Sequence, residues 1–351
     1  MTGKLSLLAA ILILPLSAQT SSPDSSWVAV SNSYTDKLVK VEMKHRPESG
    51  SEQGLSQYDA LASQPTLADE DQARRETAAV LAELKSAVGQ QKQKPVAQDL
   101  QIVIRKVELG FREQDFERAH IVPFMNASGM VFRGLHSLLD EQTPTERRPA
   151  AVLRIREYAG LAAGYQPLTV ILKQRVSEQM AKPNAIYPAR TEIETELGRN
   201  SNYLEGIAAL LEKYNLKDWQ EPFGKLKAQL VDYDAWTRAN VLPKARTDFR
   251  LPPEEYALNL EDYGIDIPPA QLAAMAHQAF TEIQAEMKPI AAQIAQERHL
   301  PSSDYRDVIH ELKKQQLVGD AILPFYENRL KQIEQIVVAQ QLVTLPDRPA
   351  R

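Results

Sequence analysis

The chain has 351 residues with a formal net charge of −5, of which 43% are hydrophobic and 25% are charged. This balance is typical of a folded globular protein, and it excludes the large basic surface that binding to nucleic acid or anionic lipid requires. The chain contains no cysteine, which excludes disulfides, thiolate nucleophiles and cysteine-ligated metals.

The first 18 residues are predicted to be a signal peptide. Lys4 precedes an apolar run over 5–16, and small and polar residues follow it, with Ala18 as the expected cleavage position. The alternative, an N-terminal membrane anchor, requires a longer apolar run. We therefore expect a protein exported to the periplasm or secreted, with a polar spacer over 19–30 and no stable membrane insertion after cleavage.

Helical periodicity then dominates the chain. Apolar residues recur at spacings of three and four, first at Tyr34, Leu38 and Val41. The same spacing predicts helices over 27–47, 66–88, 95–120, 130–139, 143–162, 189–215, 219–240, 268–298, 305–314 and the stretch up to 342. Alternation with a period of two is almost absent. The expected fold is all-α: one irregular multi-helix domain over 31–351, with about a dozen helices and little or no sheet.

One helix start is marked by several signals. Thr143 is placed to cap a helix, Pro144 suits its first position, and Glu146 lies three residues after the cap. The pattern predicts a helix that begins at Pro144.

His310 and Glu311 match the first two letters of the zinc-protease pattern H-E-x-x-H. The second histidine of that pattern would stand at position 314, which is Lys314, and a protonated lysine has no lone pair for a metal. Helical geometry also places His310 on the side opposite Val308 and Leu312. This stretch is therefore predicted to be a solvated helix face.

No catalytic residue or metal ligand can be assigned in the rest of the sequence. The other histidines have no partner at ligand spacing; they are His45, His120, His136, His277 and His299. Carboxylate pairs such as Glu254–Glu255 are typical of the solvated faces of an acidic helical protein. A metal site formed by distant histidines is the least favoured alternative.

The loop over 240–264 is the richest polar and aromatic segment. Arg246 and Arg250 are candidates for clamping a substrate carboxylate, and Tyr256 for stacking or donating a hydrogen bond. In the alternative interpretation, this is a structural loop whose arginines bond the C-terminal ends of helices.

Three stretches carry a family resemblance: "SNSYTDKLVKVEMKHRPESGSEQGLSQYD", "LPKARTDFRLPPEEYALNLEDYGIDIPPAQL" and "DYRDVIHELKKQQLVGDAILPFYENRL". They resemble the N-terminal half of a bacterial family known as domain of unknown function 885, whose members are similar to zinc metallopeptidases of the gluzincin type. In that family the zinc motif lies in the C-terminal half, so no position here matches a zinc ligand. The resemblance implies a zinc-dependent peptidase parent.

Two functions are therefore expected. In the first, 31–351 is the exported scaffold half of a peptidase-like protein, inactive by itself because the half with the zinc motif is absent. Its partners would be a peptide substrate or the missing C-terminal half. In the second, the chain is a stand-alone, non-catalytic helical module that binds a peptide or a partner chain.

Overall fold

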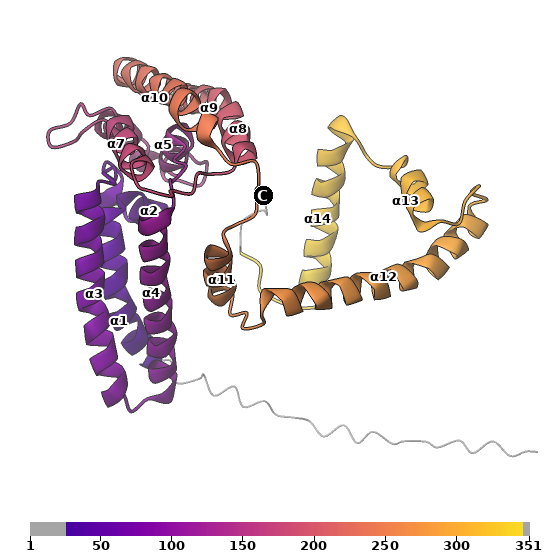
Figure 1. Cartoon of the computed structure of the whole chain (residues 1–351). Helices are drawn as coiled ribbons and strands as arrows, with labels where there is room; N and C mark the ends of the chain where they lie inside the picture. Colours follow the sequence, from indigo (N-terminus) through magenta and orange to yellow (C-terminus); the bar gives the residue numbers. More distant parts are fainter. Residues whose placement is uncertain (1–25, 347–351) are drawn as a thin grey trace, which may run out of the picture. The chain divides into compact units, whose positions relative to one another are not determined.

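The computed structural model describes residues 26–346. The predicted signal peptide and most of the predicted spacer lie outside these residues, and the last residues of the spacer belong to the first helix. Contacts divide the chain into two compact units, with the division between Ile265 and Asp266 (Figure 1). The sequence prediction of one domain over 31–351 places no boundary at this position, because no change in composition marks it.

Three long helices form the first layer of the N-terminal unit: α1 (Ser26–His45), α3 (Leu67–Gln90) and α4 (Lys94–His120). They lie side by side in Figure 1 and contact one another pairwise. Val80 and Leu84 of α3 pack on Val96 and Leu100 of α4, and apolar residues of α1 cover this cluster. Thr66 caps α3 because its side chain accepts a hydrogen bond from the amide of Asp69.

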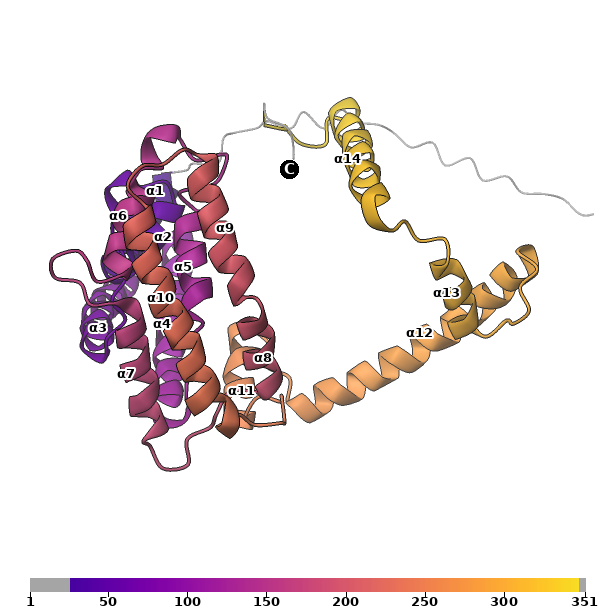
Figure 2. The ribbon, with the colours of Figure 1, turned by 90° about the horizontal axis from the view of Figure 1, so that it is seen from above.

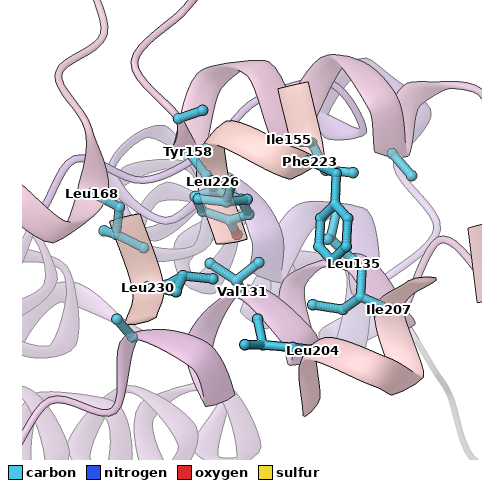
Figure 3. Close-up of a cluster of buried hydrophobic side chains, with 14 of the residues drawn as sticks. Val131, Leu135, Ile155, Tyr158, Leu168, Leu204, Ile207, Phe223, Leu226 and Leu230 are labelled. Carbon is cyan, nitrogen blue, oxygen red and sulfur yellow. The ribbon is translucent and has the colours of Figure 1, made fainter. Parts of the chain in front are cut away.

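A second helical layer follows in the chain. Its helices are α5 (Ala127–His136), α6 (Ala150–Tyr158), α7 (Leu168–Met180), α8 (Arg190–Gly198), α9 (Asn200–Lys213) and α10 (Gln220–Asn240). In Figure 2, α5 lies near α6, α9 and α10, and all three contact it. Figure 3 shows the largest buried cluster, in which Val131 and Leu135 of α5 meet Ile207 of α9 and Leu226 of α10.

Short elements complete this unit: α2 (Pro47–Glu52), η1 (Ser56–Tyr58), η2 (Thr145–Arg147), η3 (Leu242–Lys244) and α11 (Pro253–Asp262). The segment that contains α2 and η1 is fixed by two arginines. Arg147 donates hydrogen bonds to Asp59, and the fully buried Arg154 donates to the backbone carbonyls of Tyr58, Leu61 and Gly134. A buried guanidinium persists only where such acceptors surround it.

The C-terminal unit consists of α12 (Pro269–Glu297), α13 (Tyr305–Lys313), η4 (Gly319–Ala321) and α14 (Ile322–Ala339). Ala291 and Ala295 of α12 pack against Val308 of α13 in a small cluster. Asp304 caps α13 by accepting a hydrogen bond from the amide of Arg306. Across the described residues, none of the helices combines the length and the apolar character needed to cross a bilayer.

The prediction of an all-α fold is confirmed. Within residues 26–346 there is no β-strand, and the β-type pairings are isolated bridges between Ile121 and Ile186 and between Ala189 and Arg246. The predicted helix start at Pro144 is wrong. Residues Thr145–Arg147 form a 3-10 turn and α6 begins at Ala150, and the Thr143 hydroxyl donates to the carbonyl of Ser137 and caps no helix.

Candidate functional site

A cleft lies between the two layers of the N-terminal unit. It consists of two neighbouring cavities of about 510 and 750 Å³. Both cavities are lined by Arg46, Glu70, Ala73, Gln114 and Met125, so they are continuous. We call the smaller cavity, which reaches α2 and α5, the α5 end. The larger one, which runs along α3 and α4 to α7, is the α4 end.

A buried histidine lines the α5 end of the cleft. His45, the last residue of α1, is 8% exposed. Its Nδ1 lies 2.7 Å from a carboxylate oxygen of Asp69, and its Nε2 lies 3.3 Å from one of Glu76. Both ring nitrogens therefore face a carboxylate of α3. His45 therefore joins α1 to α3 and is already committed to these two partners.

The Glu70 carboxylate joins three helices at the point where the two cavities meet. It accepts a hydrogen bond of 2.5 Å from Arg175 of α7 and one of 3.3 Å from Arg118 of α4. Arg118 also bonds Asp71 at 2.5 Å. These pairs fix one wall of the cleft, because each carboxylate is held by a guanidinium from another helix.

The floor of the α5 end is a hydrogen-bonded group around Glu48. Its Oε1 accepts bonds from the Tyr158 hydroxyl at 2.7 Å and from the Ser63 amide at 2.9 Å. Burial, followed by the charge of Glu48, raises the pKa of Tyr158 well above its usual value, so the phenol stays protonated. Gly134 makes room for this group, since a Cβ there would lie 2.3 Å from the Tyr158 hydroxyl oxygen.

Several buried polar atoms at the α4 end have no hydrogen-bond partner. They are Nε of Arg118, Nε of Arg175 and Oε1 of Gln179, and all three residues line the larger cavity. Gln179 is 7% exposed and Arg175 is 6% exposed. A buried polar group without a partner costs about 1–3 kcal/mol, so these atoms favour a ligand that supplies both donors and acceptors.

Charged groups of both signs lie free in the cleft. The guanidinium groups of Arg46 and Arg133, both exposed, make no hydrogen bond or ion pair with any described residue. The same holds, within 26–346, for the carboxylates of Glu52 at the α5 end and of Glu113 and Glu117 at the α4 end. The cleft therefore offers unsatisfied charges to a ligand that carries both signs.

Glu117 lies where like charges gather. The pKa of its carboxyl is raised, and the main cause is that protein atoms displace water around it, although the residue remains partly open to solvent. The negative charges of Glu255, Glu113 and Glu70 raise the pKa further. Arg46 opposes this shift. Glu113, Glu117 and Glu255 also line a small cavity between α4 and α11. The cavity at the α4 end is also lined by Arg74, Arg118 and Arg175, but these arginines are bonded to other side chains, so apart from Arg46 the unpaired charges at this end are negative.

The structure brings Arg246 and Arg250 together, but through the backbone. The Arg246 guanidinium donates to the carbonyls of Tyr187 at 2.9 Å, Asp248 at 2.6 Å and Arg250. The Arg250 guanidinium is exposed and lies 3.5 Å from Asp248. Tyr256 is 39% exposed on α11. Arg246, but neither of the other two, lines a separate shallow cavity of about 370 Å³ next to α8.

The prediction for His310 and Glu311 agrees with the structure. His310 is exposed on α13, Val308 on the same helix is buried, and Glu311 pairs with Lys314 at 2.6 Å. Among the described residues, no group of three or more His, Cys, Asp or Glu side chains is arranged to hold a metal ion.

Sequence reasoning missed the cleft. The hydrogen-bonded partners in the cleft lie far apart in the sequence, by up to 105 positions for Glu70 and Arg175. The same holds for His45 with Asp69 and for Glu70 with Arg118. No local pattern joins them. The one available signal was the pair of acidic residues in the first turn of α3, which a helix N-terminus alone already explains.

Comparison with known proteins completes the description of the chain. No curated protein matches it, and no solved structure matches it. The family model described as "Bacterial protein of unknown function (DUF885)" matches residues 47–351, which is most of the chain and includes every element from α2 onward. The chain therefore belongs to the bacterial protein family DUF885.

Proposed function

We propose that this chain binds a peptide in the cleft between its two helical layers, as the substrate-binding scaffold of an exported, zinc-peptidase-like protein. The observation that carries the proposal is the set of unsatisfied groups in one cleft. Free guanidinium groups, free carboxylates and buried polar atoms without partners line the same continuous cavity. A peptide supplies an amide donor, a carbonyl acceptor and terminal charges of both signs.

The size and the lining of the cleft support this choice. Its cavities have the volume of pockets that hold small ligands. Met125, Met130 and Leu172 give the α5 end an apolar surface beside the polar one. A nucleic acid is disfavoured because the acids Glu113 and Glu117 would repel its phosphates.

The proposal assigns binding to the described residues and derives no hydrolytic step from them. Zinc, which the family resemblance implies for a peptidase, activates a bound water and needs three protein ligands. The described residues do not fit this requirement, because no such group is present among them. Substrate contacts from Arg246, Arg250 and Tyr256 remain a prediction, as does export to the periplasm or the medium.

Blocking the cleft tests the proposal. Ala73 of α3 lines both cavities, so Ala73→Phe places a ring where they meet. Ala79→Phe on the same helix is the matched control, because Ala79 is exposed and lies outside the cleft lining. In calorimetric titrations with a pool of short peptides, the wild type and Ala79→Phe should bind, and Ala73→Phe should not. Peptide binding that survives Ala73→Phe, or no binding by the wild type, would contradict the proposal.

A second candidate function is the binding of a partner chain along α14. This helix exposes a row of large apolar side chains at Leu323, Tyr326, Leu330 and Ile333, which are 66%, 65%, 37% and 48% exposed. Their spacing of three and four suits an amphipathic partner helix. The double variant Leu323→Glu/Ile333→Glu should then abolish capture of such a partner while leaving peptide binding unchanged. A partner that binds the variant equally would exclude this surface.

A further inference from the structure

The two ends of the cleft differ in their free charges. At the α5 end, Arg46 and Arg133 line one cavity, and their guanidinium groups make no ion pair with a described residue. At the α4 end, Glu113 and Glu117 lie one helical turn apart on α4 and line the other cavity. Arg46 lines both cavities and so stands between the two groups.

We propose that the cleft binds a peptide in one direction, with the C-terminal carboxylate at Arg46 and Arg133 and the N-terminal ammonium at Glu113 and Glu117. This inference rests on the proposed function, and it adds the class of ligand: a short peptide with both ends free. Arginine suits a carboxylate because its planar donors match the two oxygens. A carboxylate pair suits an ammonium group, which has three donors and no acceptor.

The other charged groups at the α5 end leave these arginines available. Asp69 is paired with His45, Glu48 accepts bonds from Tyr158 and Ser63, and Glu70 is held by two arginines. Glu52 is the exception, because it is exposed and free at the same end. Its charge should weaken carboxylate binding, so Glu52→Gln is expected to strengthen it.

At the α4 end, Arg74, Arg118 and Arg175 are paired with carboxylates, so the unpaired charges there, apart from Arg46, are negative. Glu113 and Glu117 face Glu255 of α11 across the small cavity that all three line. Glu70 of α3 adds a further negative charge, which Arg46 offsets in part. A ligand ammonium placed here would lower the repulsion among these carboxylates, whereas a second carboxylate would raise it. This asymmetry sets the direction of the peptide.

An independent observation supports a peptide group in the larger cavity. Gln179, more than nine-tenths buried, lines the larger cavity, and its Oε1 has no hydrogen-bond partner. Nε of Arg175 in the same wall is likewise without an acceptor. A peptide N–H and a peptide C=O are the groups that would satisfy these two atoms after a small adjustment of either side chain.

The test uses one short uncharged sequence in four forms: both ends free, C-terminally amidated, N-terminally acetylated, and blocked at both ends. Calorimetry measures the Kd of each form for the full chain, for Arg133→Gln and for Glu113→Gln. Arg75→Gln is the matched control, because Arg75 is exposed on α3, makes no bond with a described residue and lies outside the cleft lining. Thermal melts verify folding, and Arg46→Gln replaces Arg133→Gln if that variant unfolds.

For the wild type and Arg75→Gln, blocking either end should weaken binding by about tenfold, the value of a charge-assisted hydrogen bond at a partly exposed site. In Arg133→Gln the loss caused by amidation should become smaller, because only Arg46 remains for the carboxylate, and in Glu113→Gln the loss caused by acetylation should become smaller, because only Glu117 remains for the ammonium. Equal binding of all four forms to the wild type would overturn the inference but leave peptide binding in place. Losses of the same size in the variants as in the wild type would also overturn it, and no binding of any form would remove both proposals.

Discussion

Arg175 of α7 donates a hydrogen bond of 2.5 Å to the carboxylate of Glu70 on α3. The Arg175 side chain is 7% exposed and that of Glu70 is 27% exposed, so water screens the pair only in part. Arg118 of α4 bonds the same oxygen. This contact therefore joins the three-helix layer to the second layer, and it forms the wall of the cleft at the point where its two cavities meet.

Arg175→Met should destabilise the protein. The methionine keeps most of the side-chain volume but leaves Glu70 with a single weaker partner, and losing a hydrogen bond to a charged group costs about 1.5–3 kcal/mol. Urea denaturation followed by circular dichroism measures the loss. Arg75→Met on the surface of α3 is the control, and it should change the free energy of unfolding by no more than about 0.5 kcal/mol. Equal effects of the two substitutions would show that the pair contributes no stability.

Arg154→Met should be more severe. The Arg154 side chain is fully buried, and it supplies donors to three carbonyls, those of Tyr58, Leu61 and Gly134. Its removal leaves these acceptors buried without partners, at a cost of about 3 kcal/mol or more. Arg156→Met on the exposed side of α6 provides the comparison in the same denaturation experiment. A loss at Arg154 no larger than that at Arg156 would contradict the role of this buried guanidinium.

Gly134→Ala tests the close packing beneath the cleft. The new Cβ would lie 2.3 Å from the Tyr158 hydroxyl oxygen, so the substitution should cost about 2 kcal/mol through overpacking. Adding Tyr158→Phe removes that oxygen and should recover part of the loss. Gly224→Ala in α10, where nothing lies within 4 Å, should instead stabilise the protein by up to about 1 kcal/mol. A neutral Gly134→Ala would show that the two helices can separate here at no cost.

Glu117→Gln should stabilise the protein at neutral pH. Because the pKa of Glu117 is raised in the folded state, this carboxyl favours folding below its usual pKa of 4.5, and that contribution is lost as the pH rises through the raised value. Glutamine stays neutral at every pH. The stabilisation, below about 1 kcal/mol for so open a site, should therefore appear at pH 7 and vanish below the usual carboxyl pKa.

Glu76→Gln should change the stability at neutral pH in the opposite direction, which is a loss. Hydrogen bonds from Lys44, Gln72 and His45 lower the pKa of Glu76 to about 2. Its contribution to stability is therefore present above the usual pKa of 4.5 and is lost as the pH falls through about 2. The variant should be less stable than the wild type at pH 7, and the difference should shrink in acid. If both variants shift stability in the same direction at pH 7, the assigned charge environments are wrong.

The helices could be predicted from the sequence because their signals are local. Tyr34, Leu38 and Val41 form an apolar stripe on α1 that packs against the α3–α4 cluster, as their spacing indicates. Thr143 shows the limit of such signals. A cap would accept a hydrogen bond from a helix amide, whereas the Thr143 hydroxyl donates to the carbonyl of Ser137, six residues earlier in the chain.

The cleft could not be predicted, since its residues meet only after the two layers pack. His45 is isolated in sequence, yet it finds two carboxylates on α3. In the loop over 240–264, the binding role predicted for the arginines stays a prediction. Which atoms they bond depends on the parallel bridge between Ala189 and Arg246, a contact between distant segments. Arg246 donates its hydrogen bonds to backbone carbonyls of loop residues, Tyr187 and Asp248 among them, and not to the C-terminal end of a helix.

Photo-crosslinking from inside the cleft tests the central claim most directly. A photoreactive residue at Thr77, which lines the larger cavity, should capture a short peptide with free ends when the full chain is irradiated. The same residue at Ala79, exposed on the same helix, should capture none. Mass spectrometry identifies the adduct and the attached peptide atom. Capture at Thr77 that excess unlabelled peptide abolishes is the predicted result, and equal capture at both positions, or none at Thr77, would contradict peptide binding in this cleft.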